Sequence, residues 1–248
     1  PGPPIGLTAP IWQYQFLSLY KDNLLIVIHQ PGYGLSEIAE KSNNKAVSDI
    51  IISTLSQLKI NKDITVLGSC FGSITATYLA KNYPEMISKI CLIGGFYDGS
   101  DLPEIDFQSM KLEDLKKMAS EISASIGKDF DVIIKDLGDS AIKKIQRFKN
   151  CKALLLDSQC ANSLICLRYL NEIKSLSTVN WLRELNQNVL CVYGDLDTVI
   201  PVKRSYEISE MTKNSLVVKI DGAGHYPYLT HPKEFNKILN VFIKEKEK

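Results

Sequence analysis

The sequence predicts an α/β protein whose mostly parallel sheet carries a helical cap inserted between two strands. Short β-branched runs alternate with longer helical segments in both halves of the chain, which is typical of parallel strands joined by helices. Between about residues 97 and 187 this alternation stops, and helical patterns occur there without a convincing strand. A length of 248 residues suits one domain of this kind.

Five runs have the length and apolar character of buried strands. They are Asn23 to His29, Asp63 to Gly68, Ser88 to Gly94, Asn188 to Gly194 and Ser215 to Asp221. Parallel strands joined by helices bring their carboxyl ends to one edge of the sheet, which is where ligands bind in open sheets. We therefore expect the functional residues in the loops that follow these strands.

Apolar residues at helical spacing predict the helices around the strands. In the α/β core these are Ser48 to Leu58, Gly72 to Tyr83 and Lys233 to Lys246, and in the insert they include Leu112 to Ile126 and Ala161 to Ile173. We divide the chain into an α/β core, residues 1–96 and 188–248, and a helical cap, residues 97–187. The alternative for the insert is a second helical domain unrelated to the functional site.

Composition and charge exclude several classes of function. The 29 basic and 28 acidic residues leave a net charge of +1, so no broad attraction to nucleic acid or to an anionic membrane is built in. The longest apolar runs, such as Leu24 to Ile28, are too short to span a bilayer. The first residues show no basic segment ahead of an apolar stretch, so no secretory signal is visible.

The cysteines favour a reducing compartment. Cys70, Cys91, Cys151, Cys160, Cys166 and Cys191 show no C-x-x-C pairing and no interleaved histidines at zinc spacing. Because a chain of this size has a full core and rarely needs disulfides, we expect reduced thiols and a cytoplasmic location, with three disulfides as the alternative. The sequence implies no metal and no organic cofactor.

Glycines surround one cysteine at the junction of a predicted strand and a predicted helix. Gly68-Ser69-Cys70-Phe71-Gly72 has the G-x-nucleophile-x-G arrangement of a nucleophile elbow. The sharp turn forces the middle residue into a strained backbone conformation, and only glycine avoids a clash two positions to either side. Cys70 is therefore the candidate nucleophile, because the helix N-terminus favours a thiolate. A buried structural cysteine is the alternative; Ser69 and Ser73 are out of register with the turn.

Two later loops supply partners for Cys70. His225 ends the run Gly222-Ala223-Gly224-His225 after the last predicted strand and provides an imidazole. The loop after the preceding strand carries two carboxylates, Asp195 and Asp197, either of which could orient that imidazole. Of the other histidines, we expect His29 to be partly buried and His231 to lie on the surface.

These elements, in the order nucleophile, acid and histidine, resemble the α/β-hydrolase superfamily over nearly the whole chain. In that family the acid usually lies in a G-x-x-D-x-x-x-P loop, which matches Asp197 rather than Asp195, and the histidine in a G-x-G-H sequence, which matches His225. The segment Gln30 to Ser36 resembles the family's R-G-x-G-x-S turn. The resemblance implies a catalytic triad of Cys70, Asp197 and His225.

The N-terminal end departs from the family pattern. The family has His-Gly followed by a residue whose backbone N–H helps to form the oxyanion hole; Pro3-Pro4-Ile5 occupies that place, and proline has no N–H. The resemblance therefore assigns the oxyanion hole to the N–H groups of Ile5 and Phe71. The family also has a central strand between those matching Asn23 to His29 and Asp63 to Gly68. We expect N-terminal strands to be missing from the sequence, or another segment to fill the gap.

Cysteine in place of the family's usual serine favours acyl transfer from thioesters. A thiol needs less help from a base than a hydroxyl does, and exchange between a carrier thioester and a thioester on Cys70 is nearly energy-neutral. We expect a thioesterase or acyltransferase for a small-molecule, hydrophobic acyl substrate, with a carrier protein as one potential donor. The alternatives are a lactone, ester or carbon–carbon hydrolase, a catalytically silent domain of this fold, and a cysteine introduced by mutagenesis.

Overall fold

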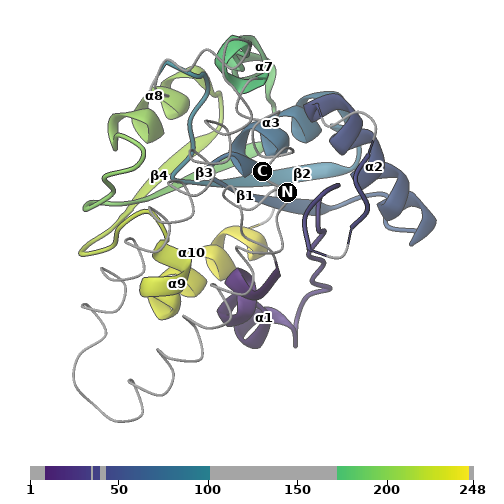
Figure 1. Ribbon diagram of the computed structural model, residues 1–248. Helices are drawn as coiled ribbons and strands as arrows, with labels where there is room; N and C mark the ends of the chain where they lie inside the picture. Colours follow the sequence, from purple (N-terminus) through teal and green to yellow (C-terminus); the bar gives the residue numbers. More distant parts are fainter. Residues whose placement is uncertain (1–8, 35, 40–42, 101–171, 246–248) are drawn as a thin grey trace, which may run out of the picture.

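The structure, a computed structural model, describes residues 9–34, 36–39, 43–100 and 172–245. A parallel sheet in the order β1-β2-β3-β4 lies at its centre (Figure 1). The strands are β1 (Ile64–Ser69), β2 (Ile87–Ile93), β3 (Asn188–Gly194) and β4 (Ser215–Ile220). β2 and β3 are apolar and buried almost throughout, as expected for parallel strands that are covered on both faces.

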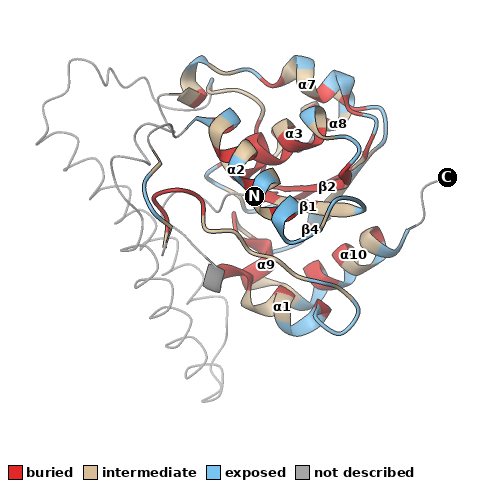
Figure 2. Cartoon of the chain, turned by 90° about the vertical axis from the view of Figure 1, so that its right-hand side faces the viewer, coloured by how far each residue is buried: buried red, intermediate tan, exposed pale blue. Residues whose placement is uncertain are grey.

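Helices cover both faces of the sheet (Figure 1). One layer consists of α2 (Asn44–Gln57), α3 (Gly72–Asn82), α7 (Val179–Glu184) and α8 (Lys203–Met211). The other consists of a 3₁₀ turn (Ala9–Trp12), α1 (Gln13–Leu19), α9 (Pro227–Thr230) and α10 (Pro232–Lys244). Each layer closes a separate hydrophobic core, and the buried residues gather between helices and sheet (Figure 2). No helix in the described ranges is long and apolar enough to cross a membrane.

Four of the five predicted strands are confirmed, each within one residue of its expected ends. The helices predicted in the core are also present, although α2 begins four residues earlier than expected. Asn43 explains that early start, because its side chain caps the helix by accepting a hydrogen bond from the Ala46 N–H at 2.8 Å. The helices α1, α7, α8 and α9 were not predicted from the sequence.

Only the two ends of the predicted cap are described, residues 97–100 and 172–187. Asp98 and Ser177 form an isolated antiparallel bridge where the ends meet. Trp181 on α7 packs edge-to-face against Tyr78 of α3, with ring centroids 5.1 Å apart, so α7 belongs to the helix layer over the sheet. The predicted cap helix 112–126 and most of 161–173 lie outside the described residues, and the division into core and cap stays a prediction.

The predicted strand Asn23 to His29 is wrong. These residues are extended but pair with none of the described strands, and no backbone hydrogen bond joins residues 24–28 to another described residue. Their apolar side chains alternate between the two cores, with Ile26 and Ile28 against one and Leu25 and Val27 against the other. That alternation produced the strand pattern, but a strand also needs a hydrogen-bonding neighbour, and among the described residues β1 pairs only with β2.

A buried lysine joins the middle of the sheet to the C-terminal helix. Lys89 in β2 is 5% exposed, and its Nζ donates hydrogen bonds to the carbonyl oxygens of Phe242 and Ile243, both at 2.9 Å, and to that of Glu245. The ammonium also lies 5.7 Å from the centre of the Phe242 ring. Because the last carbonyls of a helix lack partners within the helix, this cation satisfies them and complements the helix dipole.

We expect Lys89→Met to lower the free energy of unfolding by about 1–3 kcal/mol, because buried carbonyls lose a charged donor. Urea unfolding followed by circular dichroism measures the change. Lys237→Met, at an exposed position of α10, is the control and should alter stability by less than about 0.5 kcal/mol. Equal losses in the two variants would contradict the capping role of Lys89.

Candidate active site

Cys70 lies at the turn between β1 and α3, with a backbone φ of 51°, a value that strains residues other than glycine. The turn brings two backbone segments into close contact. A Cβ on Gly68 would lie 2.3 Å from the carbonyl oxygen of Gly72, so only glycine fits there. The Cys70 N–H donates to the Ile93 carbonyl at 2.9 Å and ties the turn to β2. The structure therefore contains the sharp turn that the glycine spacing predicts.

The two serines beside Cys70 have structural partners. Ser73 Oγ donates to the Cys70 carbonyl at 2.6 Å and accepts from the Phe96 N–H at 3.3 Å, which links the turn to the loop after β2. Ser69 Oγ donates to the hydroxyl of Tyr228, in the other core, at 3.3 Å. These bonds agree with the expectation that neither serine takes the nucleophile's place.

The loops after β3 and β4 bring a carboxylate and an imidazole together. His225 Nδ1 lies 2.8 Å from Asp197 Oδ2, and the two side chains are 3% and 2% exposed, respectively. Asp197 Oδ1 accepts from the N–H groups of Val199 at 2.8 Å and Ile200 at 3.0 Å, so its own loop orients the carboxylate. Since Nδ1 is engaged by Asp197, Nε2 is the ring atom that remains for chemistry.

The neighbours of His225 favour its protonated form. Burial of the ring acts to lower its pKa, but the negative charge of Cys70 and the hydrogen bond to Asp197 outweigh burial and raise the pKa from 6.5 to about 10. Nε2 is buried, and the Cys70 side chain adds a hydrogen-bond contribution that also favours the protonated ring. A protonated imidazole beside a thiolate is the pairing by which cysteine nucleophiles are activated.

A family comparison identifies the fold. Residues 9–232 match the family model described as the alpha/beta hydrolase fold. The chain belongs to the α/β-hydrolase fold family. The expected resemblance to that family is therefore confirmed, and so is the parallel α/β architecture.

Three known proteins illustrate the similarity. The pimeloyl-[acyl-carrier protein] methyl ester esterase of Wigglesworthia glossinidia brevipalpis is 24% identical over 252 residues, covering 97% of this chain and 91% of the esterase. Polyketide synthase ThaQ of Burkholderia thailandensis is 22% identical over 249 residues, which are 98% of this chain and 12% of the synthase. The enol-lactonase from Burkholderia xenovorans LB400 has a TM-score of 0.75 at 14% identity, covering 98% of this chain and 89% of that one.

A glycine that the sequence analysis did not single out packs against the acid and the histidine of this α/β-hydrolase. Gly94 follows β2 with a φ of 51°. A Cβ at this position would lie 3.0 Å from Nδ1 and Cε1 of His225 and 3.2 Å from Asp197 Oδ2. The available signal was the Gly94-Gly95 pair directly after the third predicted strand.

The other candidate acid and histidines do not reach this pair. Asp195 Oδ1 accepts from the Gly222 N–H at 2.7 Å, which ties the two loops together, so Asp197 is the residue that contacts the imidazole. His29 is half-buried, as expected. The ring of His231 bonds to the hydroxyl of the preceding threonine at the start of α10 and is also half-buried rather than fully exposed.

Of the two predicted oxyanion donors, only Phe71 lies in the described part of the chain. Its N–H is at the N-terminus of α3 and donates to no carbonyl among the described backbone groups. The Phe71 ring packs edge-to-face on Phe96, with centroids 5.2 Å apart. A free N–H at a helix N-terminus suits a developing negative oxygen. Ile5 lies outside the described residues.

The described cysteines other than Cys70 are inert thiols in the sheet. Cys91 on β2 and Cys191 on β3 are buried and free. Burial raises the pKa of Cys191 to about 12 and also raises the pKa of Cys91. Cys151, Cys160 and Cys166 lie outside the described residues. Within the described ranges, no group of three or more His, Cys, Asp or Glu side chains is placed to hold a metal ion.

We expect stability to fall as pH rises between about 6.5 and 10, because His225 binds its proton more tightly in the folded chain than in the unfolded chain. The stabilisation from protonated His225 is fully present below pH 6.5 and is lost as the pH rises to the pKa of His225 in the folded chain, about 10. Asp197→Asn should flatten the fall, as measured by urea unfolding across this range. Asp195→Asn, in the same loop, should keep the wild-type slope. If the free energy of unfolding fell equally steeply with pH in the wild type and in Asp197→Asn, Asp197 would not be a residue that raises the pKa of His225.

We also expect Gly94→Ala to lower kcat by roughly 10-fold, because the new methyl group pushes the His225–Asp197 pair out of its position. The measurement is hydrolysis of a chromogenic ester. Gly222→Ala is the matched control: its φ is also positive, at 73°, but its Cβ would meet only His231 Nε2, at 3.7 Å. Both variants should lose about 1–3 kcal/mol from backbone strain. If Gly94→Ala and Gly222→Ala had similar kcat values, contact between residue 94 and the His225–Asp197 pair would not affect catalysis.

Proposed function

We propose that this α/β-hydrolase cleaves acyl thioesters through a covalent acyl-enzyme on Cys70, with His225 as acid and base and Asp197 as the group that orients it. The observation that carries the proposal is the 2.8 Å contact between Asp197 and His225, in which the charge of Cys70 helps to raise the imidazole pKa to about 10. An imidazole with this pKa stays protonated at neutral pH and stabilises a neighbouring thiolate.

The first half of the reaction forms the acyl-enzyme. The Cys70 thiolate attacks the acyl carbonyl carbon, and the carbonyl oxygen becomes an oxyanion that accepts a hydrogen bond from the Phe71 N–H. As the tetrahedral intermediate collapses, the leaving thiol takes the proton from His225 Nε2. The products are a free thiol and an acyl thioester on Cys70, and His225 is left neutral.

The second half releases the acyl group. His225 Nε2 removes a proton from water while the water oxygen attacks the thioester carbonyl, and the Phe71 N–H again holds the oxyanion. Collapse of this intermediate breaks the bond to sulfur and yields the carboxylic acid, the Cys70 thiolate and protonated His225. Asp197 keeps the ring oriented through both halves and offsets its positive charge. Ile5, predicted as the second oxyanion donor, would strengthen the same step.

The relatives support an acyl group presented on a carrier protein. The esterase relatives are described as acting on pimeloyl-[acyl-carrier protein] methyl ester, and another relative is a polyketide synthase. The nucleophile itself favours a thioester, since the acyl group moves from one sulfur to another at little cost in free energy. The second candidate is hydrolysis of a carboxyl ester on the same kind of substrate, which the names of the esterase relatives favour.

We expect Cys70→Ala to lower kcat on acyl thioesters of N-acetylcysteamine by at least about 10³-fold, because no covalent intermediate can form. Cys91→Ala removes a thiol that is buried in the sheet and should leave kcat within a few-fold of wild type. Intact mass spectrometry after a short incubation should show one acyl adduct on the wild type and none on Cys70→Ala.

Three outcomes would count against this function. Full activity in Cys70→Ala would remove the proposed nucleophile. Faster turnover of the oxygen ester than of the thioester with the same acyl group would favour the carboxyl-ester candidate. Absence of any adduct, together with equal labelling of all cysteines by iodoacetamide, would favour a catalytically silent domain.

A further inference from the structure

Ser73, three residues after Cys70, holds the peptide group that carries the Phe71 N–H. The Cys70 carbonyl and the Phe71 N–H belong to one trans peptide, which points its C=O and its N–H in opposite directions. The Cys70 carbonyl accepts hydrogen bonds from the Ser73 N–H at 2.9 Å and from Ser73 Oγ at 2.6 Å. These two bonds direct the carbonyl into the first turn of α3, so the Phe71 N–H points away from that turn.

The loop after β2 contacts the same hydroxyl. The Phe96 N–H donates to Ser73 Oγ at 3.3 Å, and the Phe96 carbonyl oxygen lies 3.2 Å from Ser73 Oγ. A hydroxyl has one proton to donate, and we direct it at the Cys70 carbonyl because that oxygen is the nearer acceptor. The Phe96 N–H, the Ser73 hydroxyl and the Cys70 carbonyl then form a series of hydrogen bonds, and the peptide at its end presents the Phe71 N–H.

Hydrogen bonds in such a series strengthen one another. An amide whose carbonyl accepts a hydrogen bond becomes a better donor through its own N–H, and this polarisation is larger where water is excluded. Ser73 is 1% exposed and Phe96 is 3% exposed, so the series is shielded from solvent. The Phe71 N–H is therefore a stronger and better directed donor than the N–H of a peptide without this support.

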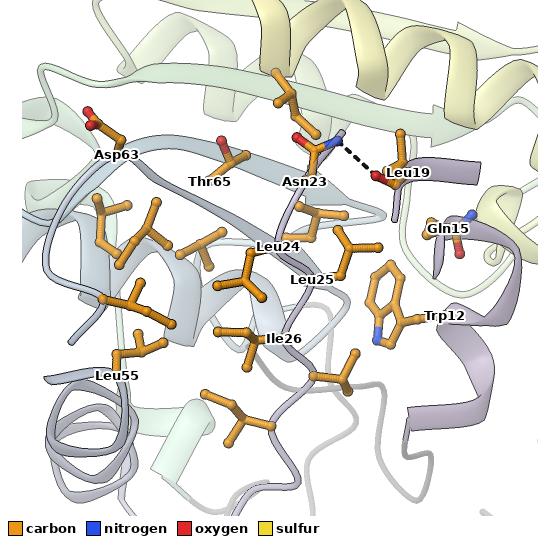
Figure 3. Close-up of a pocket in the computed structure, with 18 of the residues that line it drawn as sticks. Trp12, Gln15, Leu19, Asn23, Leu24, Leu25, Ile26, Leu55, Asp63 and Thr65 are labelled. Atoms are coloured by element: carbon orange, nitrogen blue, oxygen red, sulfur yellow. Dashed lines mark hydrogen bonds between the residues drawn. The ribbon is translucent and has the colours of Figure 1, made fainter. Parts of the chain in front are cut away.

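The apolar cavity beside β1 does not extend to these hydrogen bonds. It has a volume of about 490 Å³, and Leu25 and Thr65 are among the residues that line it (Figure 3). Among the described residues, its lining on β1 ends at Leu67 and includes neither Ser73 nor Phe96. Water that entered this cavity would therefore not reach the place of the Ser73 hydroxyl. Removal of the hydroxyl then leaves the carbonyl of the nucleophile with one donor fewer.

We propose that Ser73 is a positioning residue for acyl transfer, which acts through the Cys70 carbonyl to orient and strengthen the Phe71 N–H. The proposal rests on the proposed function, in which this N–H holds the oxyanion in both halves of the reaction. The carbonyl oxygen of a bound substrate carries little charge, whereas the oxyanion carries a full one. A stronger donor therefore stabilises the transition state more than it stabilises the bound substrate. Loss of the Ser73 hydroxyl should slow acylation without weakening substrate binding.

The test compares two reactions of Cys70 in the wild type and in Ser73→Ala. Acylation by an N-acetylcysteamine thioester passes through an oxyanion, whereas alkylation by iodoacetamide displaces iodide from carbon and forms no oxyanion. We expect Ser73→Ala to lower the single-turnover acylation rate at saturating substrate by about 10-fold, since the donor is weakened and not removed. The half-saturating substrate concentration, and the alkylation rate at each pH, should stay within about 2-fold of wild type. Quenched-flow mass spectrometry measures acylation, and peptide mapping measures alkylation of Cys70.

Further variants separate this role from a general loss of structure. Ser69→Ala removes an equally buried hydroxyl beside Cys70, one that bonds to Tyr228 in the other core, and should keep the wild-type acylation rate. Ser73→Thr keeps the hydroxyl and should acylate within about 3-fold of wild type. If Ser73→Ala fails to fold, Ser73→Cys places a weaker donor at the same position and should lower the acylation rate by about 3-fold. An unchanged rate in Ser73→Cys would then overturn the proposal.

The remaining outcomes distinguish this proposal from the proposed function. Equal acylation rates in Ser73→Ala and Ser69→Ala, or a Ser73→Thr variant as slow as Ser73→Ala, would overturn the role of Ser73. An alkylation rate that fell as far as the acylation rate would also overturn it, because Ser73 would then only hold the thiolate in place. Full thioester hydrolysis by Cys70→Ala would remove the proposed function and the role of Ser73 together. An inactive Cys70→Ala beside an unchanged Ser73→Ala would remove the role of Ser73 alone.

Discussion

The turn between β1 and α3 is the constraint on which the rest of the site depends. Gly68 and Gly72 approach so closely that no side chain fits between their backbones, and this contact lifts Cys70 into a left-handed conformation at the sheet edge. The hydrogen bonds from Ser73 and to Ile93 then fix the turn to the neighbouring strand and loop. Backbone contacts therefore set the position of the Cys70 thiol within the core.

The sheet converts that local turn into a three-residue arrangement. Because β1, β3 and β4 run in the same direction, the loops that follow them share one edge, and the histidine and the carboxylate arrive from the two later strands. The hydrogen bond between Asp195 and Gly222 holds those two loops in register. Within this frame the charge of Cys70 and the hydrogen bond that His225 donates to Asp197 overcome the cost of burying a protonated ring.

Local patterns predicted the features that depend on local physics. The glycine spacing around Cys70 and the apolar runs of β1 to β4 are visible in the sequence because sterics and burial act on consecutive residues. The extended segment at Asn23 to His29 has the same apolar pattern, yet it pairs with no strand in the described part of the chain. Strand pairing is a non-local property that no window of sequence contains. Likewise, the contact of Gly94 with His225 joins residues 131 positions apart, and the role of Lys89 in capping α10 joins residues more than 150 apart.

The two buried thiols in the sheet have a consequence for inhibitor chemistry. Cys91 and Cys191 stay protonated and shielded at neutral pH, since burial raises the pKa of each. Of the three cysteines in the described ranges, only Cys70 has an imidazole and a free helix N–H beside it. A weakly electrophilic warhead, such as a chloroacetamide, would therefore react poorly with Cys91 and Cys191, because the reacting species is the thiolate and both thiols are held in the protonated form.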